Sequence, residues 1–128
     1  MATLDFVIFN PRWLVQEHTF KPPYFHRNCM SEFMGSISGA YDAKGEGFGP
    51  GCSSLHSCMT PHGPDAESYE KAVNAPEKPF KTAEDGLAFM FESGYLMKTS
   101  RWAMEDWAEV QPDYAQSWQP LKNIKHEA

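Results

Sequence analysis

The sequence predicts a mainly β or α+β fold, and two observations carry this prediction. Ten prolines and nine glycines in 128 residues break the chain into short elements. Material for a core is present, because 41% of the residues are hydrophobic and 14% are aromatic. A chain of this length buries roughly two-thirds of its unfolded surface around one core. We therefore expect residues 1–128 to form a single domain.

Strands are expected near the N-terminus, close to the end of the first third of the chain and at about two-thirds of its length. Residues 5–9 are typical of a strand that ends before Pro11, and residues 12–15 of a shorter one. Residues 33–41 alternate weakly between apolar and polar side chains, which favours another strand. The continuous apolar run over 87–91 predicts a strand that is covered on both faces.

Helices are expected to be few and short. Asp65 is a good N-cap for a helix over residues 66–73, and residues 113–118 favour a second, shorter helix. The pattern over 102–110 is ambiguous between strand and helix. The glycine-rich stretch over 45–51 lacks the ending of a phosphate-binding loop, and we interpret it as a lid or a connection.

Two short segments contain the candidate metal-binding residues. Two histidines and one carboxylate are the ligand set of a mononuclear non-haem Fe(II) oxygenase site. Such a set holds the metal on one face and leaves other positions for substrate and dioxygen. The segments run over residues 24–35 and 55–65, and they contain His26, Glu32, His56 and His62.

The spacing of these residues constrains how they could meet at one metal. His26 and Glu32 lie roughly 20 Å apart along a straight strand at about 3.3 Å per residue, whereas metal donors lie at about 2.0–2.2 Å from the ion. A helix would place them on largely opposite faces. Residues 27–31 must therefore bend if both bind a metal. His56 and His62 have the same separation, so we expect one to reach the metal and the other to lie behind it or against the substrate.

Charge and cysteine usage exclude several classes of protein. The net charge is −6 without a basic stripe, so we expect no nucleic-acid partner and no anionic membrane. No apolar run approaches the ~20 residues of a membrane span, and no signal peptide is evident, so we expect a cytoplasmic protein. A small zinc protein that uses Cys29, Cys52 and Cys58 with histidines is an alternative, which the lack of paired Cys-x-x-Cys spacing weakens.

Several motifs occur in order along the chain: residues 5–9, Pro11-Arg12-Trp13, the two segments described above, residues 87–92 and the tail over 118–122. Together they resemble the C-terminal part of homogentisate 1,2-dioxygenase, and the match covers nearly the whole chain. The resemblance implies a cupin-like domain of the jelly-roll type with short helices. It also implies Fe(II) as the cofactor.

The resemblance assigns roles to five residues. Carried over by position, the family's iron ligands fall on His26, Glu32 and His62, and His62 is also placed against the substrate. The substrate-contacting tyrosine falls on Tyr41, and a histidine with a catalytic role beside the ligands falls on His56. Without the resemblance, a tyrosine at position 41 would be interpreted as a core aromatic and each histidine as a structural side chain.

The activity implied by the resemblance is oxidative ring opening of homogentisate with dioxygen, which gives maleylacetoacetate in phenylalanine and tyrosine breakdown. The implied assembly is a homo-oligomer, either a trimer or a hexamer. Family members are much longer, with a large β-rich N-terminal portion and an upstream histidine that acts as a base, and this chain has neither. The alternative is therefore a truncated, inactive remnant that acts as a metal-binding or assembly module.

Overall fold

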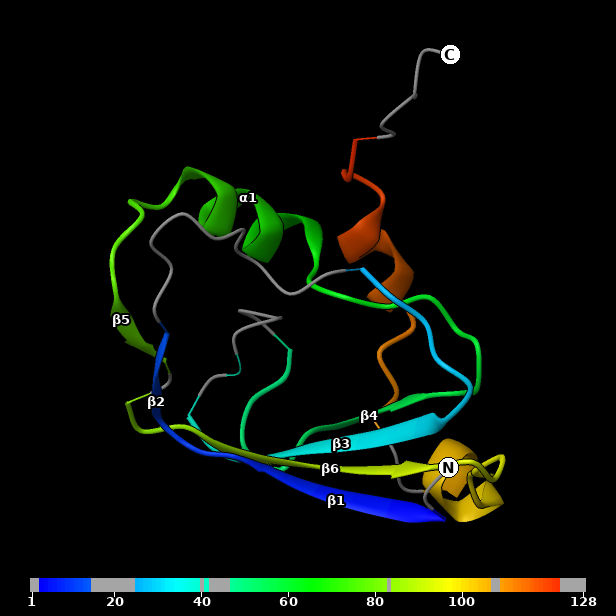
Figure 1. Cartoon of the computed structure of the whole chain (residues 1–128). Helices are drawn as coiled ribbons and strands as arrows, with labels where there is room; N and C mark the ends of the chain where they lie inside the picture. Colours follow the sequence, from blue (N-terminus) through cyan, green and yellow to red (C-terminus); the bar gives the residue numbers. More distant parts are fainter. Residues whose placement is uncertain are drawn as a thin grey trace.

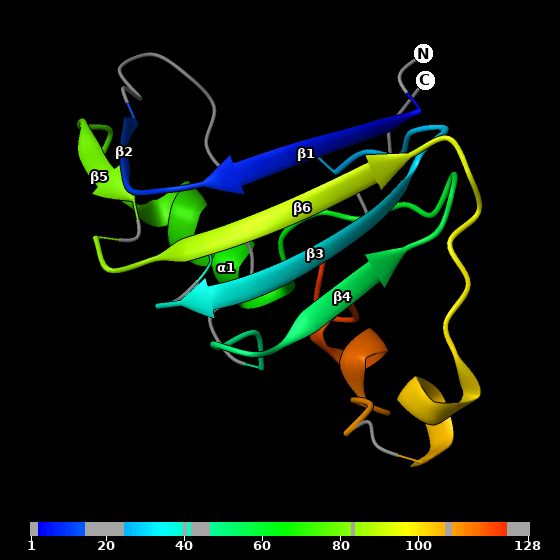
Figure 2. The ribbon, with the colours of Figure 1, turned by 90° about the horizontal axis from the view of Figure 1, so that it is seen from below.

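A four-stranded antiparallel sheet is the main element of the computed structural model, which describes residues 3–14, 25–39, 41, 47–82, 84–106 and 109–122. The strand order is β1-β6-β3-β4, so the last strand in sequence lies between the first and the third (Figure 2). This antiparallel sheet with few short helices confirms the predicted mainly β class. The strands are β1 (Leu4–Phe9), β3 (Ser31–Ser38), β4 (Ser53–His56) and β6 (Leu87–Ser93).

The remaining elements are short. Asp65 caps α1, since its side chain accepts a hydrogen bond from Ser68 N at 2.8 Å, as the sequence predicts. Residues 45 and 46 of the glycine-rich stretch over 45–51 lie outside the described residues, and its role as a lid or a connection stays a prediction. The elements are the paired strands β2 (Arg12–Leu14) and β5 (Phe80–Thr82), the helix α1 (Ala66–Asn74), the π-helical turn η1 (Trp102–Asp106) and the 3-10 turn η2 (Tyr114–Trp118). None of the described helices combines the length and apolar composition that a membrane span requires.

One face of the four-stranded sheet carries the core. Figure 1 shows α1 and η2 above this face, with β1, β6, β3 and β4 below them. Side chains alternate along each strand, and the residues that point to this side from β3 and β6 include Met34 and Ala88. Both are buried and cluster with Phe48, and Phe9 and Met90 pack against them. The same alternation places Glu32 on this face.

The opposite face of the sheet is apolar and largely open. No described helix or strand crosses in front of it in Figure 2. Phe6 is 56% exposed and Ile8 is 47% exposed, while the rings from β6 are half-buried, so the expected cover on both faces of residues 87–91 is only partly present. We call this surface the aromatic face, and it consists of Phe6, Ile8, Phe33, Leu55, Phe89 and Phe91.

Candidate metal centre

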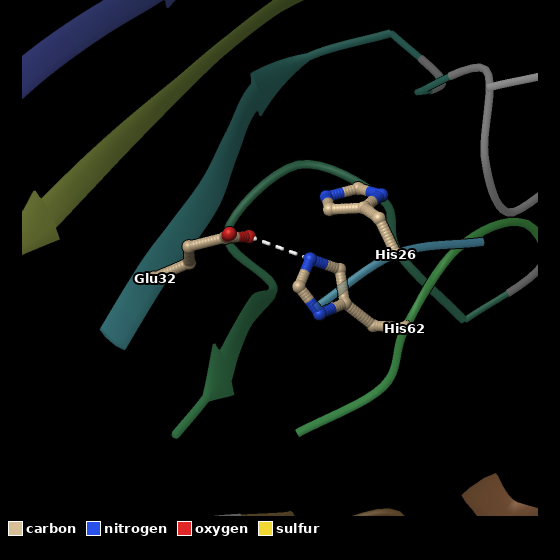
Figure 3. Close-up of side chains that lie close together, drawn as sticks. All are labelled: His26, Glu32 and His62. Carbon is tan, nitrogen blue, oxygen red and sulfur yellow. Dashed lines mark ion pairs between the residues drawn. The ribbon is translucent and has the colours of Figure 1, made fainter. Parts of the chain in front are cut away.

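Three side chains from distant parts of the sequence converge above β3. One ligand atom each from His26, Glu32 and His62 lies within 4.8 Å of the others (Figure 3). The closest pair is His62 Nε2 and Glu32 Oε2, at 2.8 Å. Glu32 and His62 are buried, whereas His26 is exposed. The cluster is therefore buried on the side of Glu32 and His62 and accessible to solvent on the side of His26.

The bend predicted between His26 and Glu32 is present. The chain bends at Cys29 and Met30 and then enters β3, which begins one residue before Glu32. Asn28 stabilises this bend, because its Oδ1 accepts a hydrogen bond from Met30 N at 2.6 Å. The bend shortens the path between His26 and Glu32, so that both side chains reach the cluster.

The two histidines of the cluster are held together by their backbones. His26 N donates to His62 O at 2.9 Å, and His62 N donates to His26 O at 2.9 Å, which forms an isolated antiparallel bridge. Gly63 allows the two segments to come this close, because a Cβ at this position would lie 2.6 Å from Cδ1 of Phe25. The ring centroids of the two histidines are 4.3 Å apart in an edge-to-face arrangement.

One hydrogen bond of His62 determines which of its ring nitrogens keeps a lone pair that could bind a metal. Its Nδ1 lies 2.9 Å from the carbonyl oxygen of Thr60. A carbonyl can only accept, so Nδ1 carries the hydrogen and Nε2 of the neutral ring carries the lone pair. This buried Nε2 has no hydrogen-bond partner among the described residues, although Glu32 Oε2 is only 2.8 Å away. A cation between the two atoms would satisfy both.

His56 lies behind His62, on β4. The two rings are stacked, with centroids 4.2 Å apart and planes inclined by 6°, and His56 Nδ1 is 3.8 Å from Glu32 Oε2. Burial, and secondarily the neighbouring His62, lowers the pKa of His56 below its ordinary value of 6.5. His56 is therefore a neutral imidazole near pH 7. Its buried Nε2 has no hydrogen-bond partner in the described part of the chain.

Tyr41 is placed in the core and not in the cluster of three. Its ring contacts Phe9, with centroids 5.6 Å apart, and Phe48, with centroids 6.1 Å apart. It lines a hollow beside Ser36 and Thr82 that contains none of the four site residues described above. The role of Tyr41 toward a substrate stays a prediction.

The three cysteines do not join the histidines. Cys29 and Cys52 are exposed, and Cys58 Sγ lies 3.2 Å from Ser31 Oγ. None of them belongs to the group of possible metal ligands found among the described residues. This arrangement argues against the zinc alternative.

A second hollow, of about 240 Å³, lies next to the cluster. His56 and His62 form part of its wall, and Tyr114 and Trp118 of η2 form another part. Burial raises the pKa of Tyr114. This proximity of η2 to the histidines could not be predicted from the sequence, because more than fifty residues separate His62 from Tyr114.

Sequence reasoning also missed two polar residues that contact Glu32 or lie opposite it. Asn28 Nδ2 donates to Glu32 Oε1 at 2.6 Å and to Glu92 Oε1 at 3.3 Å. Glu92 is the residue of β6 that pairs with Glu32 of β3. Burial, together with the charge of Glu32, raises the pKa of Glu92. The position of Glu92 at the end of an apolar run was visible in the sequence, but its partner was not.

Comparison with known proteins identifies the family. Residues 1–125 match the family described as "Homogentisate 1,2-dioxygenase C-terminal". The chain belongs to this family. The family match agrees with the cupin-like, β-rich domain that the resemblance implies, and with the antiparallel sheet that the structure shows.

The relatives of the chain are longer proteins. Homogentisate 1,2-dioxygenase of Dictyostelium discoideum is 58% identical over 123 residues, which cover 96% of this chain and 28% of the relative. The homogentisate 1,2-dioxygenases of Drosophila melanogaster and Mus musculus are 55% and 51% identical, over 95% and 96% of this chain and 28% of each relative. The chain thus spans a little more than a quarter of the length of these homogentisate 1,2-dioxygenases.

Proposed function

We propose that His26, Glu32 and His62 bind Fe(II) and that the chain forms the iron site of a homogentisate 1,2-dioxygenase. One observation carries the proposal. The buried Nε2 of His62 has no hydrogen-bond partner among the described residues and stands 2.8 Å from a carboxylate oxygen, within a cluster whose ligand atoms lie within 4.8 Å of one another. Without a cation or a proton between them, two electron-rich atoms would face each other at this distance.

The donor set fits a ferrous ion. Two imidazoles and one carboxylate are the protein ligands of non-haem Fe(II) oxygenases, and they leave coordination positions for other molecules. The hydrogen bond from His62 Nδ1 to Thr60 O fixes the tautomer, as outer hydrogen bonds of metal-binding histidines commonly do. The exposed side of the cluster, at His26, provides an approach for ligands.

Each residue of the site is proposed to have a separate role around the metal. When bound, Fe(II) supplies Lewis-acid and redox chemistry toward a phenolic substrate and dioxygen. Glu32 offsets part of the metal charge, and His26 and His62 fix the position of the ion. His56, a neutral imidazole stacked on His62, is proposed to have a catalytic role from behind this ligand, by influencing its position and electronic properties. Tyr41 is proposed to contact the substrate, on the basis of the family resemblance.

The proposed reaction of the complete enzyme is the opening of the homogentisate ring with dioxygen to give maleylacetoacetate, in the cytoplasm and in a homo-oligomer such as a trimer or hexamer. Relatives at 51–58% identity carry the name of this enzyme. Because the chain spans 28% of the length of these relatives, the reaction, its substrates and the assembly are proposals for this chain. Residues 1–128 are proposed to be the family's C-terminal iron-binding domain.

The proposal is tested by anaerobic titration with Fe(II). The protein should bind about one equivalent, and Glu32→Gln should weaken binding by at least about 100-fold, because it removes the only charged ligand of the three. Glu77→Gln, at an exposed glutamate outside the site, is the matched control and should bind as the unchanged protein does. Equal binding by all three proteins would overturn the assignment of Glu32.

The second candidate, a metal-binding or assembly module without turnover, is favoured by the aromatic face. A surface with Phe6 at 56% and Ile8 at 47% exposure is of the kind that becomes buried against another protein surface. Oxygen consumption separates the two candidates. Iron-loaded protein that consumes dioxygen when homogentisate is added supports the enzyme, whereas iron binding without oxygen consumption supports the module.

A further inference from the structure

We infer that Asn28 is a positioning residue of the metal centre, whose side-chain amide holds one oxygen of Glu32 so that the other oxygen faces His62. The inference rests on the proposed iron site and extends it to a residue that does not itself contact the metal. Asn28 lies in the bend between His26 and Glu32, so it is close to both proposed ligands along the chain.

The two oxygens of Glu32 have different partners. Oε1 accepts a hydrogen bond from Asn28 Nδ2 at 2.6 Å, and Oε2 lies 2.8 Å from His62 Nε2. A carboxylate on a two-carbon stem has several rotamers, and a donor on one oxygen selects among them. The amide of Asn28 therefore directs Oε2 toward the two histidines.

Asn28 is itself held from two sides. Its Oδ1 accepts from Met30 N at 2.6 Å, and its backbone oxygen accepts from Met59 N at 2.8 Å. The first bond fixes the orientation of the amide, because Oδ1 must face the backbone N–H and Nδ2 must then face the carboxylates. The second bond ties the bend to the segment that leads to His62. A side chain fixed in this way loses little further freedom when it orients Glu32.

A neutral donor at this position also separates two acidic side chains. Glu32 and Glu92 are direct cross-strand partners on β3 and β6, and like charges in this relation destabilise a sheet. Asn28 Nδ2 reaches both of them, at 2.6 Å and 3.3 Å. Without this donor, Glu32 would be free to turn its carboxylate away from Glu92 and from the position that faces the histidines.

The test is the affinity for Co(II), whose visible absorption reports on coordination without any turnover. Asn28→Asp has the same shape and keeps an acceptor for Met30 N, but it replaces the donor by a carboxylate oxygen. We expect the Co(II) affinity to fall by about 10–100-fold and the visible spectrum to change. Asn74→Asp is the matched control, since Asn74 also donates to a glutamate, Glu70, but on the exposed helix α1. It should leave affinity and spectrum unchanged.

Two further variants keep the test decisive. Asn28→Ser keeps a hydroxyl oxygen that can accept at the bend, removes the amide nitrogen that donates to Glu32 and adds no charge. It therefore decides the question if circular dichroism shows that Asn28→Asp does not fold. Adding Glu92→Gln to Asn28→Asp exchanges the amide and the carboxylate between the two positions, and it should recover part of the lost affinity. A residue that only stabilises the bend would show no such recovery.

The outcomes separate this inference from the proposed function. Unchanged protein that binds no Co(II) and no Fe(II) would remove the metal centre and the role of Asn28 with it. Unchanged protein that binds Co(II), together with a folded Asn28→Asp or Asn28→Ser variant that binds it equally well, would overturn the role of Asn28 alone.

Discussion

The two faces of the four-stranded sheet are built from the same strands but differ in what covers them. On one face, Met34 and Ala88 are buried together with Phe48, and Tyr41 packs against them. On the other, Phe6 is 56% exposed although it packs on Phe91, with ring centroids 4.7 Å apart. Alternation along each strand thus places Glu32 and the core on one side and the aromatic rings on the other.

The candidate metal centre and the core depend on the same strand, β3. Glu32 stands two positions before Met34 on β3, so the strand that buries Met34 also aims Glu32 at the histidines. The aromatic face contributes less to the stability of the described structure, because its largest side chains remain partly in contact with solvent. We therefore expect substitutions on the two faces to lower the free energy of unfolding by unequal amounts.

The largest effect is expected for Met34→Ala. Met34 is 8% exposed in the core cluster, and truncation of a buried methionine lowers the free energy of unfolding by about 2–4 kcal/mol. Urea denaturation of the metal-free protein measures this loss. Met104→Ala, at a methionine that is 48% exposed, is the control and should change stability by less than about 0.5 kcal/mol.

A smaller effect is expected for Phe6→Ala on the aromatic face. The ring contact with Phe91 is lost, but more than half of Phe6 is already exposed, so we expect a loss of about 1 kcal/mol. The same urea denaturation applies, with sedimentation to follow the oligomeric state. A loss as large as that of Met34→Ala would contradict the expected difference between the two faces, because it would mean that another surface covers the aromatic face in solution.

The smallest effect is expected for Glu92→Gln on the site face. The pKa of Glu92 is raised above its ordinary value of 4.5 by burial and by Glu32, so the folded chain keeps this proton at pH values where the unfolded chain has released it. The free energy of unfolding therefore falls as the pH rises from 4.5 through the folded pKa. The variant lacks this loss, so it should be more stable at pH 7, by less than about 1 kcal/mol because solvent screens the charges.

The measurement for Glu92 is a pair of urea denaturation series at pH 4 and pH 7 on metal-free protein. The two proteins should agree at the lower pH and diverge at the higher one. A variant that is less stable at pH 7 would show that the carboxylate of Glu92 is stabilised, and not strained, on this face.

Much of the local structure followed from the sequence because short-range rules determine it. Asp65 predicted the start of α1, the apolar runs predicted β1 and β6, and the spacing of His26 and Glu32 required the bend between them. The order of the strands did not follow, since β6 lies between β1 and β3 through pairings between distant residues. The exposure of the aromatic face depends on the same pairings, and a continuous apolar run gives no sign of it.

The candidate site was predictable in its residue types but not in its supporting contacts. The two histidine-bearing segments indicated the metal-binding group, and the structure brings His26, Glu32 and His62 together. The neighbourhood of Glu32 could not be predicted, because Glu92 reaches it only through the register of β3 and β6. Asn28 was close in sequence, but its donation to Glu32 depends on the exact conformation of the bend.

The paired backbone hydrogen bonds between His26 and His62 have a consequence for metal exchange. The two proposed metal ligands are already held together by these bonds, so the conformational entropy lost in bringing them together is lost during folding and not when a metal binds. Metal stripped by a strong chelator should therefore return quickly and without refolding. Amide hydrogens at these two positions should exchange slowly even in the apoprotein.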